Sequence, residues 1–141
     1  MSICNFNNVT VKTSRCTDIN TAAGANAVLK VYDNSAGIPA DASVAAVGVL
    51  LATLACSATF GVVTTGVSGG AKPYLTANAI TSANGVATGT PGYCRLQTSG
   101  GVGVVDLDVG ATGSGASVIM TPDTITSGAP VAISSVVINE A

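Results

Sequence analysis

The chain has no histidine and no tryptophan, and only 9% of its 141 residues are charged, against about 25% in typical soluble domains. Without an imidazole, the Ser-His-Asp and Cys-His devices lack the base that activates their nucleophile. No lysine stands in a Ser-x-x-Lys motif, and the glycine-rich stretches lack the Gly-Lys-Ser/Thr ending of a phosphate-binding loop. We therefore expect no enzyme active site of these classes.

Basic residues are also scarce, and the net charge is -2. The five that occur are scattered along the chain, namely Lys12, Arg15, Lys30, Lys72 and Arg95. Such spacing offers no stripe that neutralises adjacent phosphates, and an aromatic content of 4% offers no stacking platform for bases. Nucleic acid is therefore not an expected partner.

Four cysteines, Cys4, Cys16, Cys56 and Cys94, have spacings that match no zinc or redox motif. No metal or cofactor is therefore expected. The first residues carry neither a basic start nor an apolar run, so no secretory signal is predicted and folding in a reducing cytoplasm is expected. The cysteines are therefore interpreted as small thiols of the core. Disulfides remain possible only if oxidation follows assembly or release.

An uncharged run over residues 42–63 is long enough to cross a bilayer as a helix. Within it, however, apolar residues at alternate positions from Leu50 to Phe60 oppose small or polar residues such as Thr53 and Ser57. This period of two is typical of a half-buried strand. No basic cluster flanks the run, so a strand is predicted and a membrane span is not.

The same alternation recurs along the chain in segments separated by Gly, Pro, Asn and Asp. Inward-facing sets are expected at Leu29 and Val31; Cys94, Leu96 and Thr98; Val105, Leu107 and Val109; Val118 and Met120; and Val131, Ile133, Ser135 and Val137. Seven to nine short strands at such intervals predict an antiparallel β-sandwich of jelly-roll or immunoglobulin-like type. We assign it to residues 28–141 as a single all-β domain.

Residues 1–27 are predicted to form an extended N-terminal segment, a strand followed by an arm or loop. Ser14 to Asn26 shows neither the helical nor the strand period. Such an arm is expected either to lie across a neighbouring subunit or to form a plain mobile loop. One or two helical turns are possible after Asp41, a good N-cap residue, and no long helix is predicted.

Asp106 and Asp108 are the best candidates for chemistry, because strand alternation places both carboxylates on one face, roughly 7 Å apart. Such a pair is able to bind calcium or to act as acid and base. The alternative is that two charges on a solvent face keep a neutral sheet soluble and discourage edge pairing. Hard cations usually need more oxygen ligands than two, so this alternative is preferred. An exposed pair of Arg95 with one of them would add little.

The order of several short segments carries a family resemblance over residues 28–138. These segments are Leu50-Leu51-Ala52-Thr53-Leu54, Phe60-Gly61, Thr76-Ala77-Asn78-Ala79-Ile80-Thr81, Ala87-Thr88-Gly89-Thr90, Tyr93-Cys94-Arg95-Leu96, Val105-Asp106-Leu107-Asp108-Val109-Gly110, Gly113-Ser114-Gly115-Ala116, Ile125-Thr126-Ser127-Gly128 and Val131-Ala132-Ile133-Ser134-Ser135. In order and spacing the chain resembles small virion proteins of tailed bacteriophages. The resemblance implies a compact β-rich protein of the phage particle, most plausibly a capsid decoration or cement protein.

We therefore expect a non-enzymatic structural protein located in the virion and assembled in the host cytoplasm. Its expected partners are the major capsid protein or other virion subunits, together with further copies of itself, a trimer being the favoured oligomer. A neutral surface rich in small apolar residues suits such contacts. Three alternatives remain: a component of the head-tail connector, tail or baseplate; a surface-displayed binding module; and an enzyme that uses Asp106 and Asp108.

Overall fold

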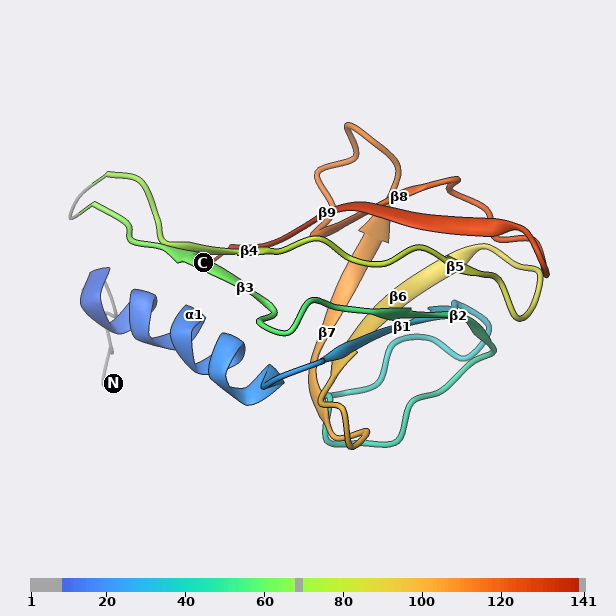
Figure 1. The fold of residues 1–141 in the computed structure, drawn as a ribbon, viewed down its shortest axis with the longest axis horizontal. Coiled ribbons are helices and arrows are strands. Elements are labelled where there is room, and N and C mark those ends of the chain that lie inside the picture. Colours follow the sequence, from blue (N-terminus) through green and yellow to red (C-terminus); the bar gives the residue numbers. More distant parts are fainter. Residues whose placement is uncertain (1–8, 68–69, 140–141) are drawn as a thin grey trace, which may run out of the picture.

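The computed structural model describes residues 9–67 and 70–139, which contain one helix and nine strands (Figure 1). In chain order these are α1 (Val9–Ala23), β1 (Val28–Asp33), β2 (Leu50–Ala55), β3 (Gly61–Thr64), β4 (Tyr74–Ala77), β5 (Ala83–Asn84), β6 (Pro91–Gln97), β7 (Gly103–Gly110), β8 (Val118–Thr121) and β9 (Pro130–Asn139). Six strands, β1, β2, β6, β7, β8 and β9, fall on the segments in which alternation was noted, whereas β3, β4 and β5 do not. The number of strands agrees with the sequence prediction.

The predicted β-sandwich is wrong, because the strands form one curled mixed sheet rather than two packed sheets. Its order is β2-β1-β6-β7-β8-β9-β4-β3, and β5 pairs with β9 off this path. Neighbouring strands are antiparallel except β7 and β8, which run parallel. The sheet curls into a half-barrel (Figure 1), so a single layer encloses the core. Side-chain alternation identifies strands, but it does not contain the pairing that separates a curled sheet from a sandwich.

The predicted extended arm is also wrong over most of its length, since residues 9–23 form helix α1. Threonine and β-branched residues are weak helix formers, and the segment has no clear amphipathic period. Tertiary contacts therefore stabilise this helix: Cys16 and Ala23 are buried, and Ile19 packs against the same core. The strand predicted at the start of the chain falls on residues 1–8, outside the described residues.

Asp41 begins no helix; residues 34–49 form an irregular loop between β1 and β2, which we call the cover loop. The strand predicted from Leu50 to Phe60 is confirmed only as far as Ala55, and a separate strand, β3, begins at Gly61. In the part of the chain that the structure describes, no helix has the length and apolarity needed to cross a bilayer.

The register predicted for β9 holds only for its first half. Val131 and Ile133 are buried as expected. In the second half of the strand, Val136 and Ile138 are buried, whereas the predicted Ser135 and Val137 are not. The cause is a bulge: Ile119 pairs with Ser135 while Met120 pairs with Ile133, so one residue of β9 has no counterpart in β8. A bulge of this kind reverses which positions face inward.

The hydrophobic core lies on the concave side of the sheet. It is formed by side chains from all the long strands together with α1. Its largest completely buried aliphatic members are Leu29, Leu51, Leu54, Leu75, Leu96, Met120 and Ile125. Most of β6 is buried on both faces, because the cover loop lies over the side opposite the core.

Candidate functional site

The predicted site residue Asp106 lies on β7 directly opposite Arg95 on β6, and the two side chains form an ion pair. Arg95 Nε donates to Asp106 Oδ1 at 2.6 Å and Nη2 donates to Oδ2 at 2.8 Å, a bidentate arrangement. The Arg95 side chain is 3% exposed and that of Asp106 is 9% exposed. The expectation of an exposed, weak pair was therefore wrong, because the cover loop removes this face of the sheet from solvent.

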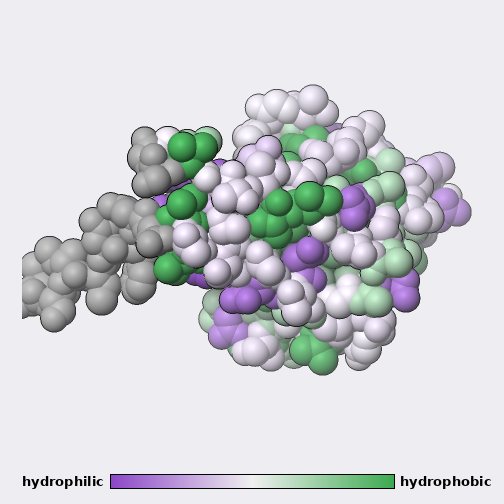
Figure 2. Space-filling model, turned by 60° about the vertical axis from the view of Figure 1, so that its left-hand side comes forward, coloured by the Kyte–Doolittle hydropathy of each residue, from purple (hydrophilic) through white to green (hydrophobic). Residues whose placement is uncertain are grey.

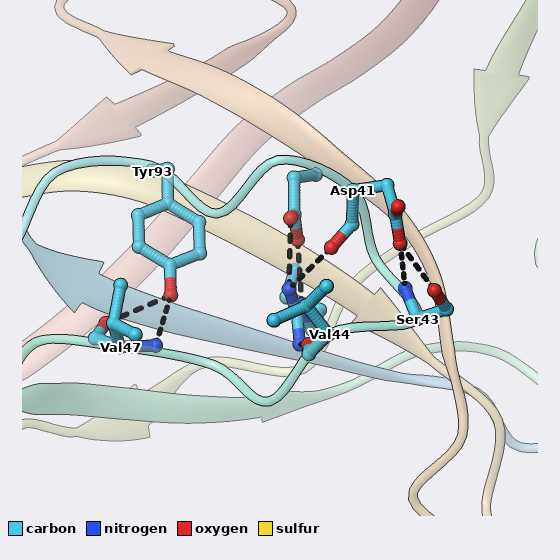
Figure 3. A network of polar contacts seen from close by, with 7 residues as sticks. Asp41, Ser43, Val44, Val47 and Tyr93 are labelled. Atoms are coloured by element: carbon cyan, nitrogen blue, oxygen red, sulfur yellow. Dashed lines mark hydrogen bonds and ion pairs between the residues drawn. The ribbon is translucent and has the colours of Figure 1, made fainter.

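The cover loop is attached to β6 by side chains rather than by a strand ladder. Arg95 Nη1 donates to the Val44 carbonyl at 2.6 Å, and Nη2 lies 3.4 Å from the Asp41 carbonyl oxygen. The Tyr93 hydroxyl donates to the Val47 carbonyl at 2.8 Å and accepts the Val47 N–H at 3.0 Å (Figure 3). We call this set of contacts, together with the Arg95–Asp106 pair, the clasp.

Aromatic packing supports the clasp from within the sheet. Tyr32 of β1 stacks on Tyr93, with ring centroids 5.2 Å apart and an angle of 13° between the rings. Burial beside Tyr93 raises the pKa of the Tyr32 phenol. Hydrogen bonding to Asp106 raises the pKa of Arg95, so the guanidinium stays charged at every pH that the fold tolerates.

Two further carboxylates bond to the cover loop, Asp33 at its two ends and Asp41 in its middle. Asp33 Oδ1 accepts the Val49 N–H at 2.8 Å and the Ser35 hydroxyl at 2.7 Å, and these bonds lower the pKa of Asp33. Asp41 Oδ1 accepts the backbone N–H and the hydroxyl of Ser43, which lowers the pKa of Asp41 (Figure 3). Both carboxylates therefore act as local loop anchors.

The second predicted site residue, Asp108, does not join Asp106 in a shared site. Its Oδ1 accepts the Ser117 N–H at 2.9 Å, and hydrogen bonding with Ser117 lowers the pKa of Asp108. Asp106 is held by Arg95 instead. Within residues 9–67 and 70–139 no three His, Cys, Asp or Glu side chains are grouped as a metal site requires.

The cysteines that the structure describes, Cys16, Cys56 and Cys94, are all buried, while Cys4 lies outside the described residues. Burial raises the pKa of the Cys56 thiol to about 11 and also raises that of Cys94. A thiol must ionise to act as a nucleophile or to bind a metal. Cys56 and Cys94 are therefore inert at neutral pH, and all three described cysteines fill the core as the sequence predicted.

A hollow of about 450 Å³ lies between the cover loop and β7, lined by residues 38–42 and 104–106. Its walls are mainly apolar, and the carboxylates of the two acidic residues that line it are both bonded: Asp106 to Arg95, and Asp41 to Ser43. The hollow therefore lacks an unpaired acid, base or nucleophile. The arrangement holds the cover loop against β6.

Sequence reasoning missed the clasp, although a signal for it was present. Tyr93, Arg95 and Gln97 alternate along β6 on the face opposite Cys94 and Leu96. A tyrosine hydroxyl, a guanidinium and a side-chain amide on one strand face are each able to hold a covering loop by hydrogen bonds.

Comparison with known proteins found no match to this chain among protein-family models, curated proteins or solved structures.

Proposed function

We propose that this chain is a non-enzymatic structural protein of a tailed-bacteriophage virion, specifically a decoration or cement protein of the head shell. The observation that carries the proposal is the state of its charged groups. Arg95 and four carboxylates, those of Asp33, Asp41, Asp106 and Asp108, are bound within the chain. The chain has few charges to begin with, and burial of Arg95 and Asp106 removes two of them from the outer surface.

Large apolar side chains occupy part of that surface. Those more than 40% exposed are Val11, Ile38, Val44, Val49, Val62, Val67, Val86 and Val102. Figure 2 shows a face made mostly of pale, near-neutral residues with patches of hydrophobic ones and only scattered hydrophilic ones. The low charge of this surface, rather than its scattered apolar side chains, favours a protein that works in contact with neighbours.

Weak contacts of this kind suit a protein bound in many copies to a repeating shell. A standard interface of about 1,600 Å² gains roughly 25 cal/mol per Å² of apolar area, and the entropy of association offsets much of that gain. Repetition over a lattice compensates for modest single contacts. Neither of the two candidate carboxylates is left for catalysis, which favours a structural role over the enzyme alternative.

The test is the copy number and position of the chain in purified phage particles. Quantitative mass spectrometry against the major capsid protein, combined with electron cryomicroscopy, is expected to find hundreds of copies on the outside of the head. A ring of six or twelve copies would assign it to a connector or tail structure instead. Absence from the particle would refute the proposal altogether.

A further inference from the structure

Residues 81–86 connect two strands, β2 and β9, that do not pair with each other. On one side, Thr81 N–H donates to the Ala55 carbonyl and Val86 N–H donates to the Leu51 carbonyl, both on β2. On the other side, β5 pairs with the first half of β9 (Figure 1). This segment, which we call the bridge segment, therefore holds the β2 edge to β9.

The bridge segment contains the dipeptide Asn84-Gly85. An asparagine followed by glycine loses ammonia more readily than other asparagines, because glycine has no side chain to hinder attack by its backbone nitrogen on the amide. Asn84 is exposed, and its side-chain amide has no hydrogen-bond partner among residues 9–67 and 70–139. Water and hydroxide therefore have access to this amide.

The folded structure restrains the nitrogen that would attack. Gly85 N–H donates to the Ala129 carbonyl at 2.9 Å, and the Gly85 carbonyl accepts the Gly128 N–H at 2.8 Å. Gly85 is buried, and Asn84 is held in an extended conformation by pairing with Pro130. Ring closure needs a free glycine nitrogen and a rotated asparagine backbone, so the closed bridge segment does not react.

Opening of the bridge segment removes these restraints. Its strand, β5, has only two residues. Among residues 81–86, Ala83 is the one apolar side chain that packs against the core, and it is only partly buried. Segments with so few buried apolar contacts open locally at a lower free energy than global unfolding requires. The opened segment exposes the Gly85 N–H and frees the backbone of Asn84 to rotate.

From these observations we propose that Asn84 is a site of spontaneous deamidation, controlled by opening of the bridge segment. In the open segment the Gly85 nitrogen loses its proton to hydroxide and attacks Asn84 Cγ. A new N–Cγ bond forms, the Cγ–Nδ2 bond breaks, and the amide nitrogen takes a proton from water and leaves as ammonia. Water then opens the five-membered imide at either carbonyl, which gives aspartate or isoaspartate. The inference goes beyond the proposed function, because it concerns chemical change of the chain rather than its location.

Isoaspartate is expected to keep the bridge segment open. Its backbone runs through Cγ, which adds one methylene carbon between position 84 and Gly85. Gly85 has little room to shift, because a Cβ placed on it would lie 2.6 Å from Ile125 Cγ2 and 2.6 Å from the Thr126 carbonyl oxygen. The lengthened segment therefore cannot restore its bonds to β2 and to β9 at the same time.

Peptide mapping by mass spectrometry at mildly alkaline pH measures the conversion of Asn84. The folded chain is expected to convert at least about tenfold more slowly than the chain unfolded in urea. Thr88→Val removes the hydroxyl that accepts the Ser127 N–H and should speed conversion of the folded chain about fivefold. Thr90→Val changes an exposed neighbour and serves as its control, and Asn84→Gln should give no product at this position.

Equal rates in the folded and unfolded chains, or no effect of Thr88→Val, would overturn the control by opening. Absence of conversion in the unfolded chain would overturn the site itself. None of these results depends on where the chain lies in a phage particle.

The effect of isoaspartate is tested on the separated product by hydrogen exchange at the Val86 amide, which bonds to β2 in the native chain. Exchange is expected to be at least about tenfold faster than in the parent chain. Asn84→Asp adds the charge without the extra backbone atom and should stay within about twofold of the parent, because the Asn84 side chain is exposed. Equal exchange in the isoaspartate product and in Asn84→Asp would refute the role of the added backbone atom.

Discussion

Removing one partner of the Arg95–Asp106 pair is expected to destabilise the protein strongly, whereas removing both is not. Arg95→Met leaves the Asp106 carboxylate without its two bonds at 2.6 and 2.8 Å in a site where that side chain is 9% exposed. Breaking a buried pair in this way costs about 3–5 kcal/mol. Asp106→Leu leaves a buried guanidinium without its carboxylate and is expected to cost a similar amount.

The double variant Arg95→Met/Asp106→Leu has no buried charge left to compensate. Its remaining cost comes from the carbonyl groups of Asp41 and Val44, which lose their donor. Such groups cost about 1–3 kcal/mol, so the double variant should be more stable than either single variant. Arg95→Lys keeps a charge but loses the bidentate geometry, and an intermediate loss is expected.

Urea unfolding followed by far-ultraviolet circular dichroism measures the free energy of unfolding of the four variants and the parent. Because a domain has only about 5–15 kcal/mol of stability, Arg95→Lys keeps the comparison measurable if a single variant fails to fold. Additive losses in the double variant would refute the argument. Single losses below about 1 kcal/mol would also refute it, since that is the range of an exposed pair.

Three further outcomes are expected. Tyr93→Phe leaves the N–H and C=O of Val47 without their partner, which should cost about 1–2 kcal/mol in urea unfolding and speed hydrogen exchange at the Val47 amide; unchanged exchange would contradict the clasp. The pKa values of Asp33 and Asp41 are lowered from 3.8 in the folded chain, so their support of the cover loop is complete above that pH and is lost as the pH falls through the lower folded values. Amide exchange in the cover loop should therefore accelerate below about pH 3.8, and a loop that loosens on raising the pH instead would refute this sign. Burial raises the pKa of Cys56 to about 11, so its labelling by a thiol reagent at pH 8 should require unfolding; rapid labelling of the native chain would show that the thiol is accessible.

Local pattern was sufficient to predict six of the nine strands and several of their buried residues, but it did not identify β3, β4 or β5. Leu29 and Val31 are buried on β1, and Leu96 on β6, because alternation in an extended chain places every second side chain on one face. The turns fall at Gly, Asn and Pro clusters for equally local reasons. The absence of histidine and the scarcity of charge also follow from composition alone.

The sites predicted from sequence failed where burial depends on a distant segment. Asp106 and Asp108 share a strand face, but the cover loop encloses Asp106 with Arg95 and leaves Asp108 to bind the Ser117 N–H. No local pattern states that residues 34–49 fold over β6. The prediction of an extended arm in place of helix α1 failed for the same reason. The stability of α1 comes from contacts of Cys16 and its neighbours with the core rather than from helix propensity.

The sequence by itself determined that this chain folds mainly as strands and carries a surface with few charges, because both properties depend on residue type and on a period of two. Tertiary structure alone decided that these strands form one curled sheet, that residues 9–23 are helical, and that Arg95 is buried. Each of these depends on which segments meet across long separations in the chain. The free energies of strand pairing and side-chain packing, rather than local conformational preferences, determine which segments contact one another.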